Sequence, residues 1–184
     1  MAWKTRREKK GRILAMRIKS CCFTGHRPEL LPWENDEGDL RCAALKSKVR
    51  CAVEGLIVER GCTKFITGMA RGADMICAEV VLALQMIYPQ IRLECAVPSR
   101  AFTARWSDGD ARKYSSILTR ADSTHFISDA QFYSKRLLML RNIYMVDNSE
   151  VVIAVYKSGE TGGTKNTISY AESKGREIII IPPG

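Results

Sequence analysis

The chain has 184 residues, of which 46% are hydrophobic and 27% are charged. This length suits a single domain, and the composition excludes a disordered or fibrous chain. No stretch reaches the roughly 18 uninterrupted apolar residues of a membrane-spanning helix, and the basic start leads into an apolar run too short for a signal-peptide core. The sequence therefore predicts one globular domain in the cytoplasm, with no membrane partner.

The net charge of +9 is concentrated at the N-terminus. Residues 1–19 carry eight basic side chains and one acid, a local charge of +7 that leaves +2 for the rest of the chain. We divide the chain into a basic N-terminal arm or extension at 1–16 and a domain at 17–184. Three interpretations of the arm stay open: a solvated tail, a segment that binds phosphate backbones, and an extension upstream of a true start at Met16.

The cysteines favour a reducing compartment. There are seven, an odd number, and no C-x-x-C spacing occurs among them. This pattern argues against a disulfide framework and against a zinc site. We expect no metal, and we expect most of these thiols to be small core residues.

From residue 17 onward, short β-branched runs alternate with helical patterns. Strands are expected at 18–23, 64–67, 92–97, 124–127, 150–156 and 177–181. Helices are expected at 40–60, from the turn at 68–74 to about 88, around 114–121, at 134–147 and at 164–174. This alternation is typical of a parallel sheet with helices on both faces. The predicted fold is a single Rossmann-like, doubly wound α/β domain with about six strands.

In such a sheet, ligands bind beyond the carboxyl ends of the strands, where the strand order reverses. The loops that follow the predicted strands are therefore the candidate site. They span residues 24–33, 68–74, 98–106, 128–134 and 157–167. The clusters of glycine, arginine, histidine and threonine in the sequence fall within these loops.

The segment Gly68-Met69-Ala70-Arg71-Gly72-Ala73-Asp74 joins a predicted strand to a predicted helix. Glycines at such a turn let the backbone approach a ligand, and free N–H groups at the helix start attract an anion. Gly68, Arg71 and Gly72 are candidate phosphate-binding residues, although the two glycines alone can also serve the turn. Asp74 would repel a phosphate there, so it caps the helix or binds a ribose hydroxyl.

A second candidate phosphate-binding loop is Gly162-Gly163-Thr164-Lys165-Asn166-Thr167, which again leads into a helix. It is not a P-loop, because Lys165 lies between Thr164 and Asn166, and no G-x-G-x-x-G fingerprint occurs. Gly162, Gly163, Thr164, Asn166 and Thr167 are the candidate ligand-binding residues. An ordinary helix start with Thr164 as its cap is the alternative.

The first strand is followed by Thr24-Gly25-His26-Arg27-Pro28. Arg27 is suited to gripping a phosphate, and His26 to bonding a base or exchanging a proton near neutral pH. His125 falls inside a predicted strand and is interpreted as structural. Trp33, Trp106 and Tyr114 are either base-stacking residues or core residues.

Recognisable catalytic motifs are absent from the sequence. It contains no G-x-S-x-G elbow, no H-E-x-x-H and no cysteine placed beside a histidine. We therefore assign no catalytic residue.

Three of these segments together carry a family resemblance. Cys22-Phe23-Thr24-Gly25-His26-Arg27-Pro28 is similar to the opening motif of the YpsA-like group of the SLOG superfamily. Thr67–Asp74 and Gly162–Thr167, with the ends Gly175-Arg176-Glu177 and Ile181-Pro182-Pro183-Gly184, also resemble the related DprA proteins. The resemblance covers about residues 17–184 and implies a Rossmann-like domain that binds nucleotides or nucleotide-derived ligands.

The superfamily also implies two other functions. Its DprA branch binds single-stranded DNA, and its LOG-type branch hydrolyses nucleotides as phosphoribohydrolases with the motif P-G-G-x-G-T-x-x-E. Aligning Gly163-Thr164 with that motif places Thr167 at the position of the catalytic glutamate. Phosphoribohydrolase activity would therefore lack its catalytic carboxylate at this position. The favoured hypothesis is a protein that binds or senses a nucleotide-type ligand without demonstrable catalysis, and no cofactor is identified. Single-stranded nucleic-acid binding is the alternative, phosphoribohydrolase activity comes third, and an oligomer is left open.

Overall fold

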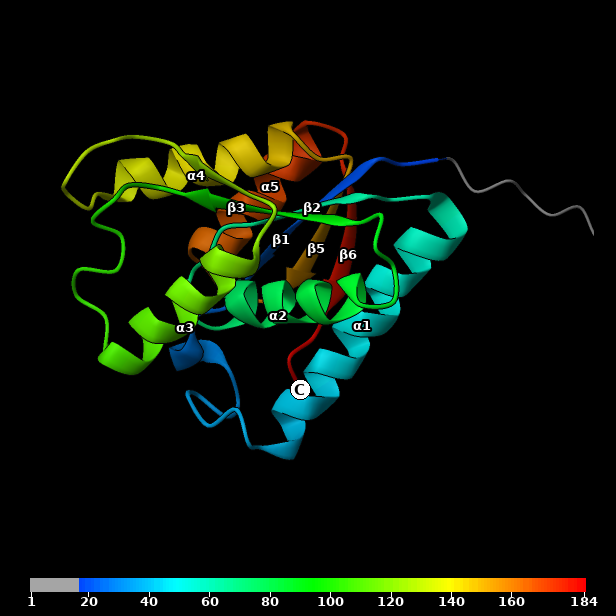
Figure 1. Cartoon of the computed structure of the whole chain (residues 1–184), viewed down its shortest axis with the longest axis horizontal. Helices are drawn as coiled ribbons and strands as arrows, with labels where there is room; N and C mark the ends of the chain where they lie inside the picture. The colour runs from blue at the N-terminus through cyan, green and yellow to red at the C-terminus, as the bar shows by residue number, and fades with distance from the viewer. Residues whose placement is uncertain (1–16) are drawn as a thin grey trace, which may run out of the picture.

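In the computed structural model, which describes residues 17–184, a central sheet lies between two layers of helices (Figure 1). The basic arm predicted at 1–16 lies outside the described residues. The helices α1, α2 and α3 cover one face of the sheet, and α4 and α5 cover the other. This is the doubly wound α/β arrangement that the alternating sequence pattern predicts.

The strands are β1 (Ser20–Gly25), β2 (Lys64–Thr67), β3 (Arg92–Val97), β4 (Ser123–Phe126), β5 (Val151–Val155) and β6 (Glu177–Ile181). The helices are α1 (Leu40–Arg60), α2 (Ala73–Gln85), α3 (Asp108–Arg120), α4 (Lys135–Asp147) and α5 (Gly163–Ser173), with a short 3₁₀ turn at Pro28–Leu30.

All strand pairs are parallel, and the strand order is β4-β3-β2-β1-β5-β6. From β1 the chain winds outward in one direction through β2, β3 and β4, and then returns to pair β5 with the other side of β1. The order therefore reverses between β1 and β5, whose ends pair as Gly25 with Val155. The ligand crevice of a doubly wound sheet is expected above this pair.

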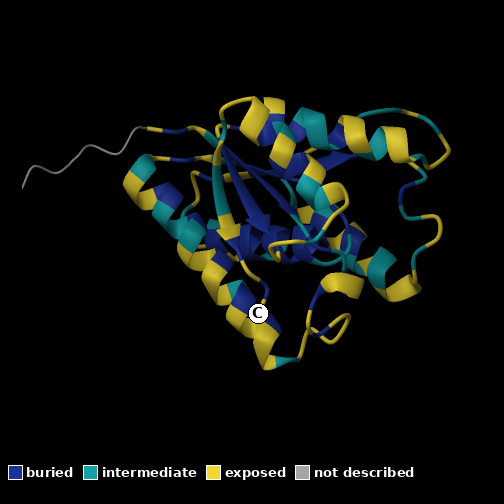
Figure 2. Ribbon diagram, turned by 180° about the vertical axis from the view of Figure 1, so that it is seen from behind, coloured by how far each residue is buried: buried dark blue, intermediate teal, exposed yellow. Residues whose placement is uncertain are grey.

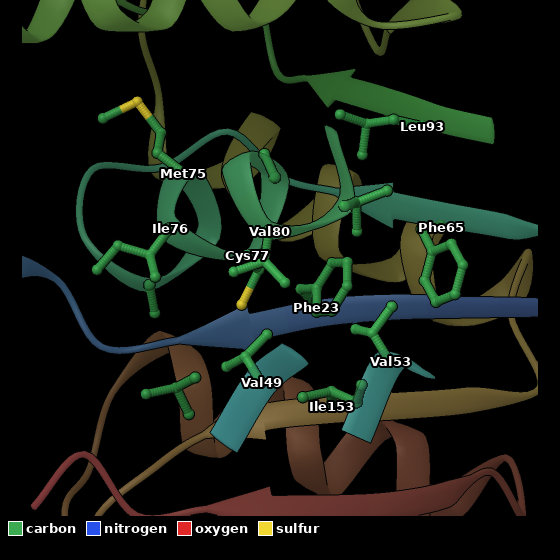
Figure 3. Close-up of a cluster of buried hydrophobic side chains, with 14 of the residues drawn as sticks. Phe23, Val49, Val53, Phe65, Met75, Ile76, Cys77, Val80, Leu93 and Ile153 are labelled. Atoms are coloured by element: carbon green, nitrogen blue, oxygen red, sulfur yellow. The ribbon is translucent and has the colours of Figure 1, made fainter. Parts of the chain in front are cut away.

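The side chains of each strand alternate between two cores. Phe23 and Phe65 point toward the layer of α1 and α2, where they meet Val53 in a large apolar cluster (Figure 3). Cys22 and Ile66 point the opposite way, into a smaller cluster beneath α4 and α5. Figure 2 shows the strands as the buried centre of the molecule, with the exposed residues on the outer helix faces.

The structure shifts several predicted boundaries. The first strand begins at Ser20 rather than at residue 18 and continues to Gly25. The helix predicted from 68–74 to about 88 begins at Ala73 and ends at Gln85, because residues 68–72 form an irregular loop that ends at Gly72 with φ +84°. The helix α1 ends as predicted, with Gly61 in the left-handed conformation.

The sequence also led to expectations about the cysteines, about metal sites and about membrane-spanning helices. Six of the cysteines are buried, Cys51 is exposed, and none within the described chain forms a disulfide. Residues 17–184 contain no cluster of side chains that suits a metal ion. Within the same range, every helix is too short or too polar to cross a bilayer.

Candidate functional site

A cavity of about 370 Å³ lies above the carboxyl ends of β1 and β5, where the strand order reverses. We call it the switch-point cavity. Its wall combines the loop after β1, the loop before α2, the first half of α4 and the start of α5. Its lining residues include Arg27, Asp74, Tyr133, Arg141, Asn142, Gly162, Gly163 and Thr164. The structure thus brings together the first-strand loop and the second glycine loop of the sequence prediction.

His26 connects the loops after β1 and β5. Its Nε2 accepts a hydrogen bond from the backbone N–H of Lys157 at 2.9 Å, and its ring packs on Tyr156 with the centroids 5.4 Å apart. The residue is 2% exposed, and burial lowers the pKa of its imidazole below the usual value. His26 therefore acts in the structure as a neutral acceptor that fixes the cavity wall, beside the buried Thr24 and the half-buried Gly25.

The floor of the cavity contains a buried ion pair. Arg141 Nη1 lies 3.3 Å from Asp74 Oδ2 and also donates to the carbonyl of Gly68, and both charged side chains are 5% exposed. Asp74 Oδ2 accepts a further hydrogen bond from the N–H of Ala70 at 3.2 Å. A Cβ atom at position 68 would overlap the guanidinium, so Gly68 makes room for Arg141. The glycine thus acts by making space rather than by contacting a phosphate.

Burial governs the electrostatics of this pair. Removal from water raises the pKa of Asp74, and the neighbouring guanidinium opposes that rise. Burial also lowers the pKa of Arg141, and its Nε has no hydrogen-bond partner among the described residues. A buried cation with an unsatisfied donor in a cavity wall favours an anionic ligand.

Arg141 was not among the predicted site residues, because it lies within helix α4 and outside the loops that follow the strands. Its sequence signal is an arginine in the middle of the apolar run Leu137–Met145. Asn142, which also lines the cavity, was missed for the same reason, whereas Tyr133 lies in the candidate loop 128–134 but was not singled out.

The start of α5 is open toward the cavity. Gly162 occupies the N-cap position with φ +108°, it offers no side-chain cap, and no acid lies in the first turn. A Cβ atom at Gly162 or Gly163 would meet nothing within 4 Å. The first N–H groups of a helix have no partners within the helix, so this end can receive an anion.

The start of α2, by contrast, is occupied by the protein itself. The N–H of Ala73 donates to the carbonyl of His26 at 3.1 Å, and the carboxylate of Asp74 lies in the first turn. Arg71 turns away to contact Glu29 at 2.8 Å and Asp110 at 3.4 Å. The structure therefore does not bring Arg71 and Gly72 to the switch-point cavity, and Asp74 serves the helix start and Arg141.

The two remaining residues of the second glycine loop also lie outside this cavity. Thr167 is buried, and its Oγ1 donates to the carbonyl of Gly163 at 2.9 Å and accepts from Nδ2 of Asn142 at 2.8 Å. Asn166 is exposed and, with Thr167, lines a groove between α4 and α5. Thr167 thus connects two helices.

The aromatic candidates separate into two groups. Trp33 and Tyr114 are buried, so the core alternative holds for both. Trp106 is half-buried and lines a second cavity beside Arg27. His125 lies in β4 as predicted and is exposed, with its ring stacked on Tyr144 at 4.1 Å between centroids.

These contacts define what the cavity can do chemically. An open helix start faces a buried arginine, and Arg27 makes no side-chain hydrogen bond or ion pair with any residue in 17–184. Asp74 is the only carboxylate among the residues that line the cavity, and it is held by Arg141 and Ala70. The arrangement suits binding of a phosphate-bearing ligand better than general acid–base chemistry.

Fold and site together define a Rossmann-like protein with an open crevice at the reversal of its parallel sheet. The chain belongs to the YspA SLOG family, whose model matches residues 21–181. This match confirms the resemblance to the YpsA-like group.

Two similar proteins are UPF0398 proteins. One, from Bacillus anthracis (strain A0248), is 29% identical over 161 residues, which cover 86% of this chain and 85% of the relative. The other, from Bacillus thuringiensis (strain Al Hakam), is 28% identical with the same coverage.

Among solved structures, the chain is similar to DNA processing protein A from Helicobacter pylori, reported for its single-stranded DNA binding mode. The TM-score is 0.59 at 16% identity, and the match covers 89% of this chain and 65% of that chain. At this identity the likeness concerns the fold alone.

Proposed function

We propose that the protein binds a nucleotide or nucleotide-derived ligand in the switch-point cavity. The observation that carries the proposal is the open start of α5 opposite the buried Arg141. A helix start alone attracts many anions, but the guanidinium of Arg141 in the same wall adds a positive charge that attracts a phosphate.

Each wall of the cavity has its own part in this binding. The N–H groups at Gly163 and Thr164 receive the phosphate, and Arg27 closes the site from the β1 side. The hydroxyl of Thr164 and the side-chain oxygen of Asn142, whose Nδ2 donates to Thr167, are available to a ribose. The free cysteines of the described chain favour action in the reducing cytoplasm.

The test is thermal melting of the full chain with nucleoside mono-, di- and triphosphates, cyclic nucleotides and ADP-ribose-type compounds. A ligand at about 100 times its dissociation constant should add roughly 2.7 kcal/mol of stability. The matched control is Arg50→Ala on α1, where Arg50 pairs with Glu54 far from the cavity, and it should keep the shift. No shift with any compound would contradict the proposal.

Single-stranded nucleic acid is the second candidate ligand. It is supported by the fold shared with the Helicobacter pylori protein and by Arg27 and Arg105, two arginines without an ion pair among the described residues that line the second cavity. Binding to a phosphate backbone predicts an affinity that falls with salt, with a log–log slope of roughly −0.7 per phosphate neutralised. If neither the full chain nor the form starting at Met16 binds oligonucleotides at low salt, this candidate is excluded.

A further inference from the structure

A second cavity of about 590 Å³ adjoins the switch-point cavity. Its wall comes from the loops after β1, β2, β3 and β4, so it lies along the same edge of the sheet. Its lining residues are Arg27, Arg71, Ala101, Phe102, Ala104, Arg105, Trp106, Gln131, Phe132 and Tyr133. Arg27 and Tyr133 line both cavities, which makes the two spaces neighbours across a shared wall.

The second cavity offers flat aromatic surfaces. Phe132 and Tyr133 are 62% and 50% exposed, which is unusual for such large rings without a partner. Trp106 is held edge-on by Phe102 at 5.0 Å and by Tyr114 at 5.5 Å between centroids. Rings presented in this way suit stacking on a nucleobase.

The positive charge of the second cavity lies at two places. Arg71 is neutralised by Glu29 and Asp110, whereas Arg27 and Arg105 make no ion pair with any described residue. Arg27 stands at the wall shared with the switch-point cavity, and Arg105 is exposed. Arg27 is therefore placed to bind a phosphate that links two nucleoside units, one in each cavity. The aromatic rings lie on the far side of Arg27 from the switch-point cavity.

The spacing of the two cavities limits the ligand further. One lies above β1 and β5 and the other above β2 and β3, two strand spacings or roughly 10 Å along the sheet. A nucleotide whose phosphate, ribose and base all lie in the switch-point cavity would leave the aromatic cavity empty. The groove between α4 and α5 also adjoins Gly162 and Gly163, but Lys135 is its only charged lining residue.

We propose that the ligand consists of two nucleoside units joined by phosphate, and that the second base stacks in the aromatic cavity. The proposal rests on the proposed function, because it assumes that the first phosphate binds at the start of α5. A free dinucleotide and the end of a single strand share this chemistry.

The test compares the affinities of a nucleoside monophosphate, a 5′-phosphorylated dinucleotide and a short oligothymidylate by calorimetry. The probes are tested on the wild type, on Phe132→Ala and Arg105→Ala, and on Met139→Ala as a matched control. Met139 is 56% exposed and lines the α4–α5 groove instead. All three side chains are exposed, so the variants should fold.

The expected result is that the dinucleotide binds at least fivefold more tightly than the monophosphate, the lower end of the range for one base–aromatic stack. Phe132→Ala should remove this advantage, Arg105→Ala should reduce it by removing an unpaired charge from the cavity lining, and both should leave the monophosphate affinity unchanged, while Met139→Ala should change neither. An oligothymidylate that binds still more tightly, with a steep salt dependence, identifies a strand as the source. If the oligothymidylate binds only as tightly as the dinucleotide, the ligand is identified as a free dinucleotide.

Two outcomes would overturn the inference. A monophosphate that binds as well as the dinucleotide leaves the proposed function standing and removes the second unit. Loss of the advantage in Met139→Ala, but not in Phe132→Ala, moves the second unit to the α4–α5 groove. If no probe binds at all, the proposed function itself fails.

Discussion

Replacing Arg141 by Met tests the buried ion pair on which the cavity floor depends. The substitution keeps much of the side-chain volume but removes the charge and its hydrogen bond to the carbonyl of Gly68. Asp74 then keeps only the N–H of Ala70 as a hydrogen-bond donor to its carboxylate. Because both partners are 5% exposed, breaking the pair should cost about 3–5 kcal/mol of unfolding free energy at neutral pH.

The loss of unfolding free energy in Arg141→Met should depend on pH. Burial already raises the pKa of Asp74 in the folded state, and loss of the guanidinium raises it further. The folded variant then binds a proton that the unfolded chain has lost, so its stability falls as pH rises from the unfolded carboxyl value through the folded pKa. The deficit relative to the wild type should therefore be smaller at pH 5 than at pH 8.

The assay is urea unfolding of both proteins at pH 5 and pH 8. Adding Asp74→Asn to Arg141→Met removes the unpaired charge and should recover at least about 1 kcal/mol at pH 8. Arg50→Met, which breaks the exposed pair with Glu54, is the control and should cost less than about 1 kcal/mol. A loss for Arg141→Met as small as that of the control, and equal at both pH values, would refute the reasoning.

Three other variants test the cavity walls. Arg27→Ala should weaken nucleotide binding by about 1.5–3 kcal/mol in calorimetry without lowering the melting temperature, because no described residue pairs with its guanidinium; a lower melting temperature with unchanged affinity would remove Arg27 from the site. Gly163→Val should abolish binding and preserve the fold, since its Cβ enters open space and, unlike Gly162, this residue has no positive φ; normal binding would contradict it. Burial lowers the pKa of His26, so wild-type stability should fall as pH drops from about 6.5 through the folded pKa. His26→Asn should lose that dependence in urea unfolding at pH 5 and 7.5, and an unchanged dependence would show that another group causes it.

Most of the fold follows from local sequence pattern. The run Val151–Val155 is buried on every residue, as expected for a central parallel strand covered on both faces. The edge strand β4 is mostly exposed, and the prediction at 124–127 was one residue late. Its register depends on pairing with β3, where Glu94 faces Ser123, and local pattern carries no information about such a partner.

Only part of the site followed from the sequence. The rule that ligands bind at strand ends selected the loops of Arg27 and Gly163, and both reach the cavity. Arg71 instead lines the second cavity, where two acids distant in sequence, Glu29 and Asp110, neutralise its side chain. The rule missed Arg141, whose position in the cavity depends on how helix α4 packs above Gly68.

The position of Thr167 bears on the hypothesis of phosphoribohydrolase activity. Cleavage of an N-glycosidic bond needs a carboxylate at the anomeric carbon, and the family comparison of the sequence places Thr167 where LOG-type proteins have one. In the structure, Oγ1 of Thr167 bonds to Gly163 and Asn142, and therefore joins α5 to α4. The nearest carboxylate in the cavity wall, Asp74, is held by Arg141. The one carboxylate that lines the cavity is thus already held in an ion pair, which agrees better with the proposed binding of a phosphate-bearing ligand than with hydrolysis.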